Sequence, residues 1–163
     1  MRDGHHSPLY QYPLLVLTLD RSQKTMVCMT QVPESSFIFD AHFPGFPVLP
    51  GVFMIETIAQ AAGMLSLTLN QFKKMAFLFG VEDTRFRDFV PPNSVLEVRV
   101  KIVQQGSGYA VAEGEIIHQN KTVANAEVRL RLAPVPNTEI EDMLKSRAQV
   151  MGIDIKVNDV HPA

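Results

Sequence analysis

The chain has 163 residues, the size of one ordinary globular domain, and 46% of them are hydrophobic, enough to bury a core without disulfides or a structural metal. Its 15 basic and 17 acidic residues give a formal net charge of -2, which argues against nucleic-acid binding driven by bulk charge. A single cysteine, Cys28, excludes an intrachain disulfide and a cysteine-rich zinc site and is typical of a reducing compartment. We therefore expect a cytoplasmic, soluble protein with no nucleic-acid partner.

Two apolar stretches need to be tested as membrane segments. The run over residues 14–19 is too short for a signal core or a membrane span. The longer run over residues 52–69 carries Glu56, and an unpaired glutamate at that depth of a bilayer would be costly. The sequence therefore predicts a buried helix in this stretch and no membrane insertion.

The first half of the chain is expected to form two strands, a stiff loop and that helix. The strands are predicted over residues 14–20 and 24–32. Between residues 37 and 51 prolines and glycines are frequent, and Phe43-Pro44-Gly45-Phe46 fits a type II turn. A helix should begin near Pro50, since proline is tolerated in a first helical turn. Its almost uniformly apolar surface predicts that other elements wrap around it.

The second half is expected to be mostly β-structure. Residues 75–81 read as a buried strand, and three further segments alternate apolar and polar side chains: 95–103, 109–118 and 122–132. Short turns between these three predict an antiparallel meander. With one buried helix against it, the sheet makes an α+β domain.

A short amphipathic helix is expected after the meander. Thr138-Glu139-Ile140-Glu141 has capping-box spacing, and Gly152 is a plausible stop. The apolar residues recur at helical intervals: Ile140, Met143, Leu144, Ala148 and Met151. We expect one domain over residues 1–134 and a helical extension and tail over 135–163. The helix would cover a sheet edge or an oligomer surface, with a specific partner as the alternative.

The segment around the helix start holds the parts of a catalytic site. His42 precedes the rigid turn, so the backbone fixes its position. Glu56 is the only charged residue of the predicted helix, so its carboxyl must be paired or hydrogen-bonded, and Gln60 lies one turn further on. The N–H groups of Gly51 and Val52 stand at the positive end of the helix dipole and could polarise a carbonyl. Each residue alone has an ordinary structural explanation, but a base, an acid and a carbonyl polariser together can remove water β to a carbonyl.

The run from His42 to Gln60 resembles the β-hydroxyacyl-[acyl carrier protein] dehydratases of bacterial type II fatty-acid synthesis. These FabZ-like proteins have the hot-dog fold, in which an antiparallel sheet wraps a long central helix. The likeness continues through Glu82-Asp83-Thr84-Arg85-Phe86-Arg87 to about Leu132. Glutamate at position 56 favours the glutamate branch over the aspartate-bearing dehydratase/isomerases. The resemblance implies dehydration of 3-hydroxyacyl-[acyl carrier protein] to the trans-2-enoyl product, in fatty-acid or specialised lipid biosynthesis, without a metal or organic cofactor.

The resemblance also implies a role for each site residue. His42 would abstract the α proton, and Glu56, held by Gln60, would protonate the leaving β-hydroxyl. The Gly51 N–H, with Val52 beside it, would bind the thioester carbonyl. In this family the histidine and glutamate of one site come from different subunits. A homodimer is therefore implied, and in this family three such dimers commonly assemble into a trimer of dimers.

Further residues are expected around the acyl tunnel and the carrier-docking surface. Phe77 occupies the position of an aromatic gate that is often tyrosine in the family. Four basic residues are candidates for docking an acidic acyl carrier protein, although solvated surface charge explains each of them equally well. These candidates are Lys73, Lys74, Arg85 and Arg87.

Two segments depart from the family pattern. Tyr10-Gln11-Tyr12-Pro13 replaces a Pro-His-Arg-type segment before the first strand, and Pro92-Asn93-Ser94 replaces a Pro-Gly-Asp turn. Neither change removes a catalytic group. They suggest a divergent member with altered acyl-chain selection.

Two other functions remain open from the sequence. In a hot-dog thioesterase Glu56 would activate water or attack the thioester, and release of free thiol would reveal it; the paired His42 disfavours this reading. A non-catalytic acyl-carrier-binding subunit would bind the carrier without turnover.

Overall fold

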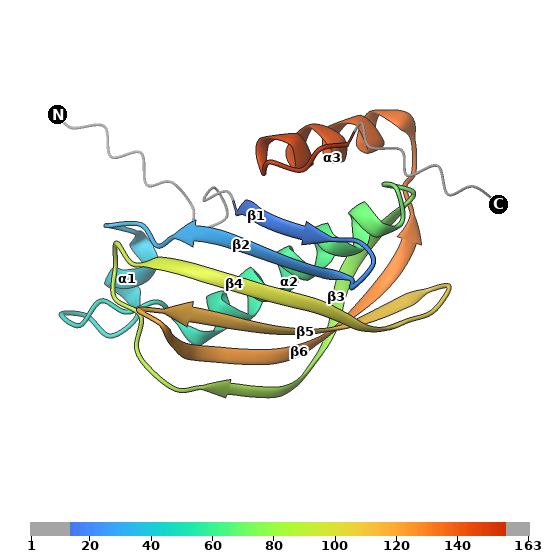
Figure 1. Ribbon diagram of the computed structural model, residues 1–163. Coiled ribbons are helices and arrows are strands. Elements are labelled where there is room, and N and C mark those ends of the chain that lie inside the picture. Colours follow the sequence, from blue (N-terminus) through green and yellow to red (C-terminus); the bar gives the residue numbers. More distant parts are fainter. Residues whose placement is uncertain (1–13, 156–163) are drawn as a thin grey trace, which may run out of the picture.

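A computed structural model of the chain describes residues 14–155. The segment at residues 10–13, which differs from the family pattern, and the tail from residue 156 lie outside the described residues. Six antiparallel strands form a single sheet in the order β1-β2-β4-β5-β6-β3 (Figure 1). The strands are β1 (Leu15–Asp20), β2 (Thr25–Gln31), β3 (Lys74–Phe86), β4 (Val95–Gln105), β5 (Tyr109–His118) and β6 (Lys121–Pro134). The helices are α1 (Phe37–Ala41), α2 (Gly51–Leu69) and α3 (Thr138–Val150).

Helix α2 lies against one face of the sheet and forms the core with it (Figure 1). The alternation predicted for the meander is confirmed: Val98 and Val100 of β4 are buried against the helix side, whereas Arg99 between them is exposed. Sheet and helix approach so closely that a Cβ at Gly114 would lie 2.3 Å from a methyl carbon of Ile58. Burying large apolar side chains such as Ile58 contributes about 1.5–3 kcal/mol each to stability. The predicted α+β arrangement of a sheet around a central helix is therefore present.

Helix α2 is long and apolar enough, by composition alone, to cross a membrane. However, 61% of that apolar window is buried inside the protein, mostly against the sheet. Such burial is typical of a core helix, as the sequence predicts.

Strand β3 differs from its prediction. Residues 75–81 were expected to be buried, but β3 runs over 13 residues and lies at the edge of the sheet, paired among the described residues with β6 alone. Phe77 is 49% exposed and Phe79 62% exposed. The prediction of burial is wrong because an apolar run does not distinguish a strand covered by its own chain from one left open at a sheet edge.

Three local details also differ from the predictions. The expected loop contains the five-residue helix α1, whose start is capped by the Ser36 hydroxyl accepting the Ile38 N–H. Such a helix is too short to show an apolar period. Helix α3 is capped by Asn137, whose side chain accepts the Ile140 N–H, and not by Thr138. Met143, expected on the buried face of α3, is 58% exposed.

The outer edge of β1 is covered by the end of α3. The Val16 N–H donates to the Met151 carbonyl at 2.7 Å. Gly152 ends the helix with φ +88°, in the left-handed region, and its N–H bonds to the Gln149 carbonyl. The predicted stop at Gly152 and the predicted covering of a sheet edge are thus both present.

Candidate active site

His42 is held between α1 and the predicted turn. Its N–H donates to the Ile38 carbonyl at 2.9 Å, and its ring packs edge-to-face on Phe43 with centroids 4.5 Å apart. The Phe46 N–H donates to the Phe43 carbonyl, and Gly45 has φ +83°, as a type II turn requires. Phe43 itself has φ +51°, a conformation that costs a non-glycine residue about 1–2 kcal/mol. The surrounding contacts therefore hold a strained backbone beside the candidate base.

The cavity beside this histidine, here called the His42 cavity, is formed around the start of α2. It has a volume of about 450 Å³, and Gly51, Val52 and Phe86 line it together with His42. The first N–H groups of a helix have no partner within the helix and carry its positive dipole end. A Cβ at Gly51 would lie 2.8 Å from the ring of Phe86. The Phe86 ring therefore packs in the space that a Cβ would fill, and a larger residue at position 51 would have to displace the ring.

Glu56 and Gln60 lie one turn apart on α2, both half-buried. The Gln60 side-chain amide donates to a Glu56 carboxylate oxygen at 2.9 Å. On its other side, the Gln60 carbonyl oxygen is 3.5 Å from the Arg147 guanidinium of α3. The candidate acid is thus oriented by a partner that is itself in contact with the C-terminal helix.

A second cavity, here called the Glu56 cavity, begins at these two residues. It has a volume of about 430 Å³ and lies between α2, β3 and α3. Phe77, the predicted gate, lines it, as do Gly63 and Met64. Glu56 and Arg147 are the charged side chains that line it within residues 14–155. An apolar chamber with a carboxyl group at one side fits a hydrocarbon chain that carries a reacting polar group.

His42 and Glu56 do not meet in one cavity of the single chain. Of the main cavities formed by the described residues, His42 lines the one at the start of α2, whereas Glu56 lines the one beneath α3 and a small adjoining space. Neither cavity holds both His42 and Glu56.

The four candidate docking residues fall into two separate pairs. Lys73 and Lys74 open β3, and Arg85 and Arg87 lie near its other end, about 35 Å away at the usual rise of a strand. The Lys74 ammonium donates to the Ser107 carbonyl, and the Arg87 guanidinium bonds to the Asn125 side chain. Arg87 also lines the His42 cavity. Of the four, only Arg87 lines a cavity that also holds a candidate catalytic residue.

Lys73 instead binds the C-terminal helix. Its ammonium lies 3.0 Å from a Glu141 carboxylate oxygen. Hydrogen bonds from Lys145 and, next in effect, from Lys73 hold the pKa of Glu141 below its ordinary value. This pair fixes α3 to the start of β3.

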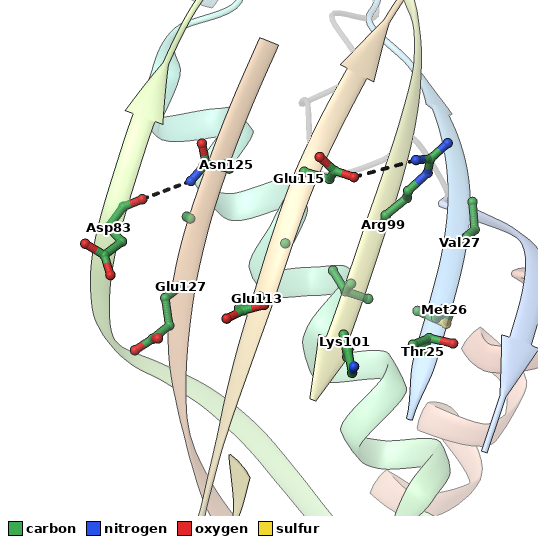
Figure 2. Close-up of a pocket in the computed structure, with 13 residues that line it drawn as sticks. Thr25, Met26, Val27, Asp83, Arg99, Lys101, Glu113, Glu115, Asn125 and Glu127 are labelled. Carbon is green, nitrogen blue, oxygen red and sulfur yellow. Dashed lines mark hydrogen bonds and ion pairs between the residues drawn. The ribbon is translucent and has the colours of Figure 1, made fainter. Parts of the chain in front are cut away.

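A third cavity, of about 460 Å³, lies on the face of the sheet away from α2 (Figure 2). Charged side chains from neighbouring strands line it, and two of them pair, with Arg99 3.6 Å from Glu115. The Asn125 side-chain amide donates to the backbone carbonyl of Asp83. Glu113 and Glu127 stand opposite each other in register. This groove has the character of a solvated outer face, and no candidate catalytic residue lines it.

Sequence reasoning missed Arg147 and the contribution of α3 to the Glu56 cavity. The spacing of Leu144 and Ala148 predicted the inward face of this helix, and Arg147 lies on the same face, three residues after Leu144. Helical spacing therefore held the signal, but nothing in the sequence indicated which element the face would meet. Cys28, by contrast, is fully buried as expected, and burial raises the pKa of its thiol to about 12.

Comparison with known proteins assigns the chain to a family. The family described as FabA-like domain matches residues 15–127, which extend from β1 into β6 and end before α3. The chain belongs to this family.

Curated relatives agree with the assignment. The chain is 36% identical to the 3-hydroxyacyl-[acyl-carrier-protein] dehydratase FabZ of Latilactobacillus sakei, over 65% of this chain and 83% of the relative. It is 34% identical to the FabZ of Solibacter usitatus, over 76% of this chain and 79% of the relative. The resemblance on the His42–Gln60 run is confirmed over most of the chain.

Solved structures confirm the hot-dog fold. The dehydratase heterocomplex ApeI:P from Xenorhabdus doucetiae aligns with a TM-score of 0.60 at 20% identity, over 80% of this chain and 86% of that one. A Streptococcus mutans protein bound to acetyl CoA aligns with a TM-score of 0.60 at 13% identity, over 83% of this chain and all of that one. At such identities the likeness shows the fold alone.

Proposed function

We propose that the chain dehydrates 3-hydroxyacyl groups carried on acyl carrier protein to trans-2-enoyl groups, in a homodimer whose sites are shared between subunits. The observation that carries the shared site is the separation of His42 and Glu56 into different cavities of one chain. The dehydratase activity rests on the FabZ relatives and on the family match.

The reaction needs one proton removed and one delivered. His42 takes the proton from the α-carbon, and the electron pair moves toward the thioester carbonyl, whose oxygen is stabilised by the N–H groups of Gly51 and Val52. The pair then forms the α–β double bond as the β-hydroxyl leaves. Glu56 of the other subunit protonates that hydroxyl, so that it departs as water. Gln60 orients the carboxyl through their 2.9 Å hydrogen bond.

The open edge of β3 supports the homodimer. It combines unpaired backbone groups with exposed aromatic side chains, including Phe79 at 62% exposure. An open apolar strand edge is prone to pair with another chain, and a second copy brings an identical edge related by twofold symmetry. In this arrangement the start of α2 in one subunit adjoins Glu56 of the other.

The carrier docks at the arginine end of β3 in this proposal. Arg87 lines the His42 cavity and Arg85 stands two residues before it, whereas Lys73 is paired with Glu141. A carrier bound there would deliver its phosphopantetheine arm toward the N–H groups that bind the thioester. Phe77 would gate the acyl chamber. We place the enzyme in the cytoplasm, where the thiol of Cys28 stays reduced.

The activity is tested with 3-hydroxybutyryl-[acyl carrier protein], followed at the absorbance of the enoyl product. We expect product without release of free carrier thiol, and thiol release would favour a thioesterase. His42→Ala and Glu56→Gln should each lower turnover by a factor of about 100 or more.

Complementation tests whether the site is shared. Co-expression of His42→Ala with Glu56→Gln gives mixed dimers, each with one site in which both residues are intact. With random pairing about a quarter of the sites are then active. If the mixture is no more active than either variant alone, the base and the acid act within one subunit and the shared site is wrong.

A further inference from the structure

Helix α3 forms one wall of the Glu56 cavity, although it lies beyond the part of the chain that matches the family. Leu144, Arg147, Val150 and Met151 line the cavity from this side, and Gly63 of α2 lines it from the other. Three of these four side chains are apolar.

This wall is fixed in place at both ends. At its start the Glu141 carboxylate is 3.0 Å from the Lys73 ammonium. At its end the Met151 carbonyl accepts the Val16 N–H of β1. Between them Ala148 is fully buried. A helix anchored in this way presents a defined surface to the cavity.

The chemistry of the proposed function gives the direction of the acyl chain. The carbonyl carbon lies at Gly51, the α-carbon at His42 and the β-carbon at Glu56 of the other subunit. Carbons beyond the β-carbon must therefore continue past Glu56, on the side away from the carrier. The space on that side is the apolar cavity that α3 closes.

We propose that α3 is a specificity element that limits the length of acyl chain accepted, because the tail of the substrate packs in the Glu56 cavity against Leu144, Val150 and Met151. This inference rests on the proposed function for the direction of the chain. It assigns a substrate-selecting role to residues of the C-terminal helix.

Val150→Phe is the variant that tests this wall. Val150 lines the cavity but is 69% exposed, so a larger side chain narrows the chamber without straining the core. The matched control is Gln149→Phe, which adds a ring at the neighbouring exposed position that does not line the cavity. The readout is the ratio of kcat/KM for 3-hydroxypalmitoyl to that for 3-hydroxybutyryl substrates on acyl carrier protein.

We expect Val150→Phe to lower this ratio by about tenfold or more, the size of effect that a few lost methylene contacts produce. Gln149→Phe should leave it unchanged. Leu144→Phe, six residues earlier on the same wall, should lower the ratio as well. Thermal unfolding shows whether each variant folds, and the second variant keeps the test available if the first does not. If folded variants at both positions keep the ratio of the unaltered protein, α3 does not select the chain and the inference is overturned.

A binding measurement separates this result from failure of the proposed function. Affinities are measured for palmitoyl- and butyryl-pantetheine amides, which cannot react. If the unaltered chain dehydrates neither substrate, the proposed activity fails; the inference about the cavity then stands only if Val150→Phe still weakens palmitoyl binding relative to butyryl binding. An unchanged binding ratio overturns it.

Discussion

The two edges of the sheet are treated in opposite ways. The edge strand β1 is covered by the chain's own C-terminal helix, through the bond from Val16 to Met151 and the contact of Arg21 with the Asp154 carbonyl. The edge strand β3 has no such cover among the described residues, and it exposes large apolar side chains such as Phe79.

The difference indicates which edge is available as the interface of the proposed dimer. Both strands are apolar, so composition alone does not separate them. Proteins protect strand edges by covering them or by pairing them with another chain. Because β1 is covered within the chain, β3 is the edge available for a second copy. Strand β3 also runs between the His42 cavity and the Glu56 cavity.

The largest expected effect comes from breaking the open edge. Phe79→Glu places a charge at the centre of the proposed interface in both subunits. Losing such a residue typically weakens association by 2 kcal/mol or more. We expect dissociation to monomers in analytical ultracentrifugation, with turnover falling in parallel because monomers lack a complete site.

Leu17→Glu is the matched control at the covered edge. Leu17 is also exposed, at 54%, and lies on β1. This variant should remain dimeric and active. If instead Leu17→Glu dissociates the protein and Phe79→Glu leaves it intact, the interface lies at β1 and the proposed interface at β3 is wrong.

A smaller effect is expected at the junction that covers β1. Gly152→Ala forces a side chain onto a residue with φ +88°, where a Cβ would also lie 3.5 Å from the Val16 carbonyl oxygen. This should destabilise the protein by about 1–2 kcal/mol in chemical unfolding. Gly108→Ala, which meets nothing within 4 Å, should change stability by less than this. Equal losses in the two variants would argue that the end of α3 is not held at β1.

The smallest effect at neutral pH concerns Cys28, which pairs in register with Val16 of the covered edge. Burial raises the thiol pKa from 9.0 to about 12, so the unfolded chain loses this proton first as pH rises. Stability should therefore fall above pH 9, by up to about 1.4 kcal/mol per pH unit from this group, until the folded thiol also titrates. In Cys28→Ala that component of the slope should be absent. Parallel stability curves for the two proteins would mean that the thiol is not shielded.

Much of the fold could be predicted because the meander is locally consistent. Residues such as Val98 and Val128 alternate with charged neighbours, and a one-residue slip would expose every apolar side chain. The same reasoning failed for β3, because Phe77 and Phe79 are apolar in a position that needs a second chain to be buried. A single sequence carries no direct record of such a partner.

The candidate site was predictable in its parts but not in its arrangement. His42, Gly51 and Glu56 lie close together in the sequence, on the turn and the first part of α2, so they could be recognised as one motif. His42 and Gly51 line one cavity and Glu56 lines another, and this division depends on where β3 and α3 pack around α2. The link from Arg147 to Gln60 joins residues far apart in the chain, and long-range contacts of this kind are not encoded in local periodicity.

The contact between β1 and the end of α3 also has a consequence for the order in which the protein is made. Arg21 and Asp154, which meet there, are separated by 133 positions. During synthesis β1 leaves the ribosome before every other described element, yet its outer edge is covered only when the end of α3 has followed. Contacts of such long sequence separation form slowly, and unpaired edges are prone to aggregation while they wait. Of the described strands, β1 is therefore made first, and its outer edge is among the last to be covered.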